Sequence, residues 1–166
     1  MVFKEAKFLS KYNHYFWERD IYSALHSGID LLYKYQKLVL VFPKDLNYPP
    51  EIVKGFQRFC QETSFTYSVI DGIDSECITA KTAFIVLEES DLVDLIKHSR
   101  TENWQLGKDI GIISYNETPL KEILANGITV ISTDHAKMGE TAAYMMLHKR
   151  KGKVINLFTL IRRNSL

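Results

Sequence analysis

The segment from Lys108 to Leu147, KDIGIISYNETPLKEILANGITVISTDHAKMGETAAYMML, decides the fold of this chain. Its apolar run from Ile110 to Ser114 is typical of a strand buried on both faces. The pair Thr118-Pro119 then favours a helix start, because the first helical position has no use for the N–H that Pro lacks. A second β-rich run covers Ile128 to Ser132, and a helical pattern over residues 134–147 completes the unit.

The rest of the chain repeats this alternation of strands and helices. Further strands are predicted from apolar runs at residues 38–42, 66–70, 82–87 and 154–159. Amphipathic helices are predicted to begin at Asp20, near residues 47–50 and after Ser90. Strands that alternate with helices favour parallel pairing and right-handed crossovers. We therefore predict an α/β fold, doubly wound around a mainly parallel sheet of about five or six strands.

Length and composition place the chain among ordinary globular proteins. Its 166 residues suit one domain, and the formal net charge of +1 gives no general attraction to nucleic acid or to a membrane. No apolar run approaches the roughly 20 residues of a membrane span, and the N-terminal segment lacks the apolar core of a secretory signal. Two cysteines do not form a disulfide framework. The expected location is the cytoplasm, without a membrane partner.

Motifs that carry catalysis or bind cofactors are missing from the sequence. There is no GxGxxG, GxxxxGK[ST], HExxH or GxSxG pattern, and the five histidines lack the spacing of metal ligands. We therefore expect no catalytic residue, no metal and no cofactor. The alternative is a small hydrolase-like α/β enzyme that uses the carboxylates of Glu88 and Glu89. That alternative also needs a base with a shifted pKa beside a nucleophile or metal.

Two polar loops are candidates for binding a small molecule. Asn116 follows the Ile110–Ser114 strand, and Asp134 with His135 follows the Ile128–Ser132 strand. Open α/β sheets bind ligands at the carboxyl ends of their strands. Each residue also has a structural explanation, since Asn116 can cap the helix at Thr118 and Asp134 can cap the last helix. For His135 that explanation is a surface side chain beside the Asp134 cap.

The same region resembles a known family of sensors. The stretch GKDIGIISYNETPLKEILANGITVISTDHAKMGETAAYMML is similar to the second half of the effector-binding domain of LacI/GalR-type repressors, which share the type I periplasmic-binding-protein fold. It looks closer still to regulators of Bacteroidetes-like bacteria that join a GntR-type winged helix to such a sensor. The resemblance extends back through YPPEIVKGFQRFC and TAFIVLEESDLVDLIK and forward to LIRRNSL, so it covers residues 20–166.

This resemblance implies roles for three of the polar residues. At the position of Asn116 the family usually has an Asp that binds sugar hydroxyls, and Asn keeps hydrogen-bonding capacity without the charge. Glu88 stands where the family often has an Asn or Asp that reaches the ligand, although a solvated carboxylate at a helix start would look the same. His135 stands at a hinge position where the family often has an aromatic ring against the ligand.

Three further positions bear on the comparison with the family pattern. Asp71 at a strand end and Trp17 at the entry crossover could line the cleft, or each could be structural. Three residues before the Gly of a Gly-Phe pair the family commonly carries an Arg that binds ligand oxygens. Here Gly55-Phe56 is preceded at that spacing by Ile52. The resemblance therefore leaves open whether the site takes a sugar in the family's usual way.

The resemblance also implies how the chain is organised. Residues 1–19 would be a linker or crossover, and residues 20–166 an effector-binding lobe whose crossover helix, 134–147, packs on a first lobe in the family. The sequence shows no match to that first lobe or to the winged helix, so we expect a longer natural protein. We also expect it to bind a small-molecule effector and to form a homodimer. Contact with DNA is expected only through a domain outside this chain. The helix face of Met138, Ala142 and Met145 should fold back on this lobe or be buried by another chain.

Overall fold

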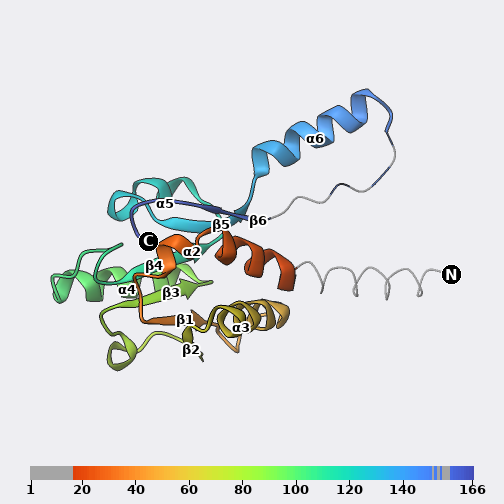
Figure 1. Ribbon diagram of the computed structural model, residues 1–166. Coiled ribbons are helices and arrows are strands. Elements are labelled where there is room, and N and C mark those ends of the chain that lie inside the picture. Colours follow the sequence, from red (N-terminus) through yellow and green to blue (C-terminus); the bar gives the residue numbers. More distant parts are fainter. Residues whose placement is uncertain (1–16, 151, 153, 155–157) are drawn as a thin grey trace.

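The computed structural model describes residues 17–150, 152, 154 and 158–166, and they form an α/β layer around one six-stranded sheet (Figure 1). The strand order is β2-β1-β3-β4-β5-β6, in which β1 to β5 are parallel and β6 is antiparallel to β5. The strands are β1 (Lys37–Val41), β2 (Thr66–Ile70), β3 (Thr82–Val86), β4 (Gly111–Tyr115), β5 (Thr129–Thr133) and β6 (Phe158–Ile161). The predicted fold class is confirmed, and β1 to β5 each lie within one residue of their predicted bounds. The predicted last strand overlaps β6, and part of it lies outside the described residues.

Helices connect the strands on both faces of the sheet. Residues 17–27 are helical, and the helices that follow are α2 (Ile29–Leu32), α3 (Glu51–Thr63), α4 (Glu89–Thr101), α5 (Pro119–Ile123) and α6 (His135–Leu147). Short 3₁₀ turns lie at Ser75–Cys77 (η1) and Leu124–Asn126 (η2). The prediction that Asp20 caps the first helix is wrong, because the helix already includes Trp17. Asp20 is instead buried inside it.

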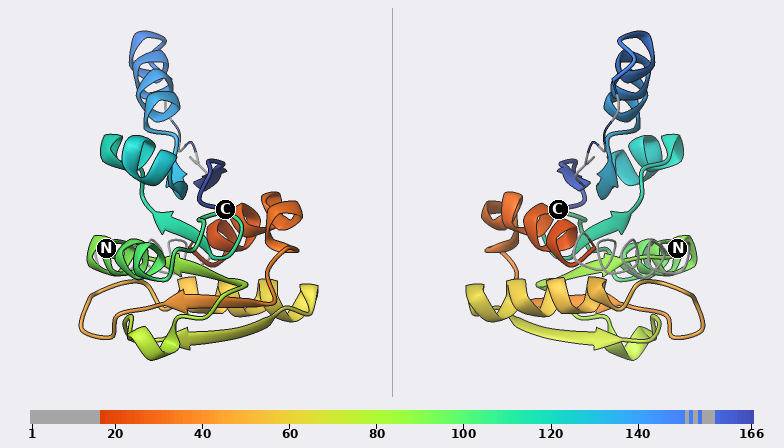
Figure 2. Two further views of the ribbon diagram at one scale, coloured as in Figure 1. Left: turned by 90° about the vertical axis from the view of Figure 1, so that its left-hand side faces the viewer. Right: turned by 90° about the vertical axis from the view of Figure 1, so that its right-hand side faces the viewer.

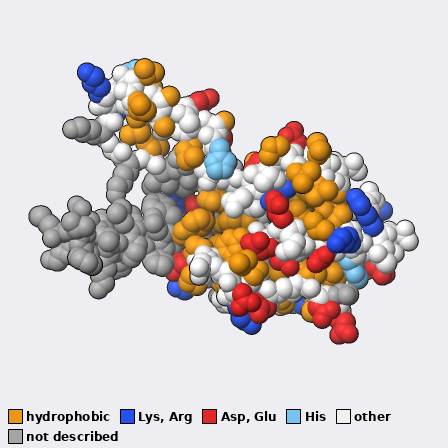
Figure 3. Space-filling view, turned by 180° about the vertical axis from the view of Figure 1, so that it is seen from behind, with side chains coloured by type: hydrophobic (Ala, Val, Ile, Leu, Met, Phe, Trp, Pro, Cys, Tyr) orange, Lys and Arg blue, Asp and Glu red, His pale blue; other side chains and the backbone are white. Residues whose placement is uncertain are grey.

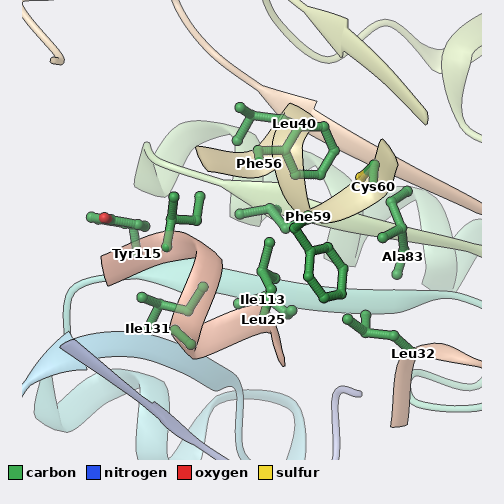
Figure 4. Close-up of a cluster of buried hydrophobic side chains, with 14 of the residues drawn as sticks. Leu25, Leu32, Leu40, Phe56, Phe59, Cys60, Ala83, Ile113, Tyr115 and Ile131 are labelled. Atoms are coloured by element: carbon green, nitrogen blue, oxygen red, sulfur yellow. The ribbon is translucent and has the colours of Figure 1, made fainter. Parts of the chain in front are cut away.

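Two apolar clusters hold the layers together. Helix 17–27, α2 and α3 cover one face of the sheet, where Leu25, Phe56 and Phe59 are fully buried against its strands (Figure 4). On the other face α4 packs through Leu92 and Leu95. The helical stripes predicted from the sequence are therefore the buried faces. Burial of side chains of this size stabilises the fold by about 1.5–3 kcal/mol each.

Gly55 allows helix 17–27 to approach α3 closely. A Cβ atom at this position would lie 2.2 Å from the backbone oxygen of Glu18 and 2.5 Å from Cγ2 of Ile21. No side chain fits at those distances, so only glycine permits this helix contact. The contact positions Trp17 and Asp20 near the end of β4.

The C-terminal segment ties β4 to β5 at their amino ends. Ser165 is fully buried, and its carbonyl accepts a 2.7 Å hydrogen bond from Ile112 N. Its hydroxyl accepts from Thr129 N and donates to Ile112 O, both at 2.7 Å. The closing LIRRNSL segment is therefore part of the sheet and fixes the spacing of the two strands that carry the candidate site.

Helix α6 projects away from the rest of the structure (Figures 1 and 2). None of its residues is buried, and Met138, Tyr144 and Met146 are exposed. Of the two alternatives expected for its apolar face, the structure does not have the first, since the face is not folded back on this lobe. The second, burial of that face by another chain, stays a prediction. The helix begins with Asp134, whose carboxylate accepts a hydrogen bond from Lys137 N at 2.8 Å.

No helix in the described part of the chain is long and apolar enough to cross a membrane. Within the same residues, no three His, Cys, Asp or Glu side chains converge as a metal site. Cys60 is buried and Cys77 is exposed, and both are free thiols.

Candidate functional site

The two polar triplets predicted at one rim, Tyr115-Asn116-Glu117 and Thr133-Asp134-His135, lie together at the carboxyl edge of the sheet. They follow β4 and β5, which are paired and parallel. Asn116 N donates to Ile131 O at 2.9 Å, and Glu117 N donates to the Ser132 hydroxyl at 3.0 Å. These bonds carry the strand pairing beyond Tyr115 into the loop. The predicted convergence of the two loops is confirmed.

A shallow pocket of about 380 Å³ opens between these loops. Its polar lining comes from Glu117, Thr133, Asp134, His135 and Thr159, and Ala136 with Ile161 adds an apolar part. His135 is exposed at the start of α6. Asp134 also lines the pocket, although one of its oxygens is already used as the helix cap. The pocket is thus rich in groups that can hydrogen bond a polar ligand.

Asn116 is exposed at the tip of the β4–α5 loop and is not part of the pocket lining. Its φ of +60° is the left-handed conformation, which Asn tolerates better than most residues. Within the described residues its side-chain amide makes no hydrogen bond, and Thr118 begins α5 without a side-chain cap bond. The structure therefore does not use Asn116 as a helix cap. Its amide is available to a ligand above the edge.

Lys121 anchors the loop that carries Asn116. Its ammonium group is buried and donates to Tyr115 O and to Asn116 O, both at 2.9 Å. Burial lowers the pKa of this ammonium, and the carboxylate of Glu89, 3.8 Å away, partly opposes that shift. Glu89 begins α4 after β3. One buried cation therefore connects the loops that follow β3 and β4.

Glu88 and Asp71 lie on the same edge but are engaged by other side chains. The Tyr48 hydroxyl donates to the Glu88 carboxylate and, at 3.3 Å, to Leu87 O. Burial and the Glu88 contact raise the pKa of Tyr48 to about 12. Asp71 accepts from Lys44 N at 2.7 Å and forms a 3.0 Å ion pair with the same lysine's ammonium, and these contacts lower the pKa of its carboxyl. Neither carboxylate lines the pocket.

Trp17 packs into an aromatic cluster below the edge. Its ring lies 5.7 Å from that of Phe158, which lies 5.5 Å from the ring of Tyr115. Beside them the carboxyl of Asp20 is buried, and burial raises its pKa from the ordinary 3.8 to about 6 despite a hydrogen bond from the Phe158 backbone. One Asp20 oxygen and the Tyr115 hydroxyl are buried without a hydrogen-bond partner in the described structure. Trp17 contributes to this cluster and not to the pocket.

Ile52 cannot reach a ligand at this edge. It is fully buried in the cluster under α3. The position where the resembling family carries an Arg is therefore part of the core. The guanidinium of that family has no counterpart here, and the site depends on the loops after β4 and β5.

Several residues that shape the site were not identified in the sequence. Lys121 donates to the carbonyls of two residues just before α5, whereas Ser132 and Tyr48 bond to residues far away in the sequence. Arg163 forms a 2.7 Å ion pair with Glu117 and donates to Ile128 O at 3.0 Å. A lysine on a short helix or a serine in a strand carries no pattern that marks such a contact. Only the positions of these residues next to strand ends could have drawn attention to them.

A mainly parallel α/β layer with polar loops gathered at its carboxyl edge is the architecture of a periplasmic-binding-protein-like lobe. The sequence matches the family described as periplasmic binding protein-like domain over residues 33–166. The chain therefore belongs to that family. A search of curated proteins finds no significant match.

Solved structures with the same fold include transcription regulators of the LacI type. The lac repressor dimer bound to operator and the anti-inducer ONPF is 15% identical, with a TM-score of 0.64 over 90% of this chain and 50% of its own. A LacI family regulator of Bifidobacterium animalis subsp. lactis is 19% identical, with a TM-score of 0.65 and coverage of 88% and 61%. One of Mycobacterium smegmatis is 12% identical, with a TM-score of 0.62 and coverage of 90% and 63%. This chain thus spans half to two thirds of their length.

Proposed function

We propose that this chain is the effector-sensing lobe of a bacterial transcription regulator. The observation that carries the proposal is the meeting of two polar loops at the carboxyl edge of β4 and β5, where Asn116 is exposed on one loop and Asp134 and His135 line a polar pocket on the other. Its fold is shared with LacI-type regulators, and the resemblance of its loops to such sensors supports the same role. The lobe corresponds to the second of the two that close around an effector.

The effector that suits this edge is a small carbohydrate. Asn116 offers two donors and an acceptor, and the Asp134 oxygen that does not cap α6 is a further acceptor, so hydroxyl groups can be bound in both directions. The exposed ring of His135 provides a flat surface of the kind that stacks on a sugar. Since Ile52 replaces the family's Arg, the ligand should be a neutral sugar or derivative and not an acidic one.

One lobe supplies only one wall of such a site. The pocket is open, and α6 presents Met138, Tyr144 and Met146 to solvent. We infer that a first lobe, outside this chain, covers that helix and closes the cleft. Effector binding would then change the angle between the lobes and, through it, a DNA-binding segment also outside this chain. A winged helix of the GntR type fits the resemblance best.

A homodimer is the assembly that the surface favours. Val93 on α4 and Leu120 and Ile123 on α5 are exposed by 42%, 58% and 75%. Large apolar side chains on neighbouring helices form a patch that association would bury. The proposed dimer uses this patch and leaves the carboxyl edge free for ligand.

The test is a titration of the ¹⁵N-labelled chain with neutral mono- and disaccharides, followed by amide chemical shifts. The expected result is a saturable shift at Asn116, Glu117 and His135, with weak affinity because one wall is missing. Asn116→Ala should weaken the shift, whereas Asp71→Asn, on the same edge but paired to Lys44, should leave it unchanged. Saturable shifts confined to other surfaces, or none at any sugar concentration, would refute the carbohydrate site.

A further inference from the structure

A second groove lies at the amino edge of the sheet, away from the candidate effector site. Its volume is about 820 Å³. Its lining comes from the last turns of α4, from the loop that precedes β4, and from η2, which precedes β5. Parallel strands place these segments at the end of the sheet opposite Asn116 and His135. The groove is therefore independent of the proposed sugar site.

The charged side chains that line this groove are both basic. Arg100 and Lys108 are the charged residues of its lining, and no carboxylate lines it. Neither cation forms an ion pair within the described structure. Lys81 donates to Lys108 O at 2.9 Å and brings a third positive charge to the same rim. Asp109, the nearest acidic neighbour in sequence, is engaged by Gln105 N at 2.9 Å. The groove is thus complementary to an anion.

The walls between those cations are apolar and partly aromatic. Trp104 is half-buried, and its ring meets that of His98 edge to face at 5.6 Å, which holds the indole in place. Ile96 and Leu106 add apolar surface to the same walls. Figure 3 shows hydrophobic and basic side chains next to each other at the end of the molecule far from α6. A flat ring can stack on the indole while its charge meets the cations.

We propose that this groove binds a small aromatic anion, a ring that carries a carboxylate, sulfonate or phosphate group. The ring would lie against Trp104, and the anionic group would pair with Arg100 and Lys108. Gln105 and Asn126 provide further hydrogen-bonding groups in the same lining. Such a site would allow the lobe to bind a second ligand away from the proposed effector site.

The probe is 8-anilinonaphthalene-1-sulfonate, and its matched control is N-phenyl-1-naphthylamine, which lacks the sulfonate. The chain has two tryptophans, so Trp17→Phe leaves Trp104 as the single donor for energy transfer to the bound dye. Saturable transfer from Trp104 to the sulfonate is expected. In the double variant Arg100→Gln/Lys108→Gln, the affinity for the sulfonate should fall about tenfold or more, as expected for loss of a charge-assisted hydrogen bond. Binding of the uncharged amine should not change.

Lys97→Gln is the matched control, because Lys97 lies on the same helix and pairs with Asp94 outside the groove. It should bind the sulfonate as the parent chain does. If Trp17→Phe does not fold, as circular dichroism would show, the indole N–H shift of Trp104 in the labelled wild-type chain reports the same binding. Equal affinity in the double variant, or absence of saturation, would overturn the proposal. The sugar titration is unaffected by any of these results.

Discussion

Replacing Lys121 by Met tests whether one buried cation holds the ligand-facing loop. The methionine chain retains the packing of the lysine stem but removes the two 2.9 Å hydrogen bonds to Tyr115 O and Asn116 O. Hydrogen bonds to a charged donor contribute about 1.5–3 kcal/mol each. Release of a buried ammonium from a site that lowers its pKa offsets part of that loss. The expected net loss is about 2–3 kcal/mol of the free energy of unfolding, because two buried carbonyls lose their donor.

Thermal and urea unfolding measure this loss directly. For a domain of this size 1 kcal/mol corresponds to about 2–4 °C in Tm, so a decrease of about 5–10 °C is expected. Amide exchange at Asn116 and Glu117 should accelerate more than exchange in β1, because the loop loosens first. Glu89→Gln removes the ion pair with Lys121 and leaves the two hydrogen bonds of Lys121 in place. Glu89 is 64% exposed and 3.8 Å from the ammonium, so its loss should cost less than about 1 kcal/mol.

Lys97→Met provides the matched control for this experiment. Lys97 is 71% exposed, and its ion pair with Asp94 is a surface contact within one helix, so the change should stay within about 0.5 kcal/mol. A Lys121→Met chain as stable as Lys97→Met, with unchanged exchange at Asn116, would refute the role of Lys121 as the anchor of this loop.

Three further predictions concern the buried carboxyl of Asp20, the apolar patch that includes Ile123, and the close contact of helix 17–27 with α3 at Gly55. Because its folded pKa of about 6 exceeds the ordinary 3.8, Asp20 should add about 1 kcal/mol to the free energy of unfolding as the pH falls from 8 to 5. Urea unfolding of Asp20→Asn at both pH values should lack this gain. Ile123→Asp should shift sedimentation from dimer to monomer, whereas Leu46→Asp, at an exposed apolar residue of the loop between β1 and α3, should not. Gly55→Ala should lower the free energy of unfolding by about 1–3 kcal/mol, because the added Cβ would meet the backbone of Glu18. Gly72→Ala is the control: its Cβ would enter open space, so the same unfolding assay should show no change.

The strands and the buried helix faces were predictable because their signals are local. Runs such as Leu38–Val41 are apolar on both faces, and only a central parallel strand buries both. In α3 the apolar residues Ile52, Phe56 and Phe59 recur at helical spacing, and all three are fully buried. The same logic placed Asn116 and His135 at one edge, since parallel neighbours end on the same side of a sheet.

The features that were missed or misread depend on three-dimensional contacts that the local sequence pattern does not show. Asp20 looks like a helix cap, but it lies inside a helix and accepts from the backbone of Phe158. Lys121 looks like a surface lysine on α5, although it is 4% exposed at its side chain. Helix α6 has an apolar stripe that suggests burial on this lobe, yet none of its residues is buried here. In each case a tertiary contact, or its absence, overrides the local pattern.

On the proposed function, we expect the loop that carries Asn116 to stay in place when a ligand binds. The β4–α5 loop is anchored by Lys121 and by the bond from Glu117 N to the Ser132 hydroxyl. We therefore infer that closure takes place where the chain leaves the lobe. Those points meet in one cluster, in which Phe158 pairs with Thr133 across β5 and β6 and packs on Trp17. A ligand at Asn116 would be sensed as rotation about this cluster, with the lobe moving as a rigid body.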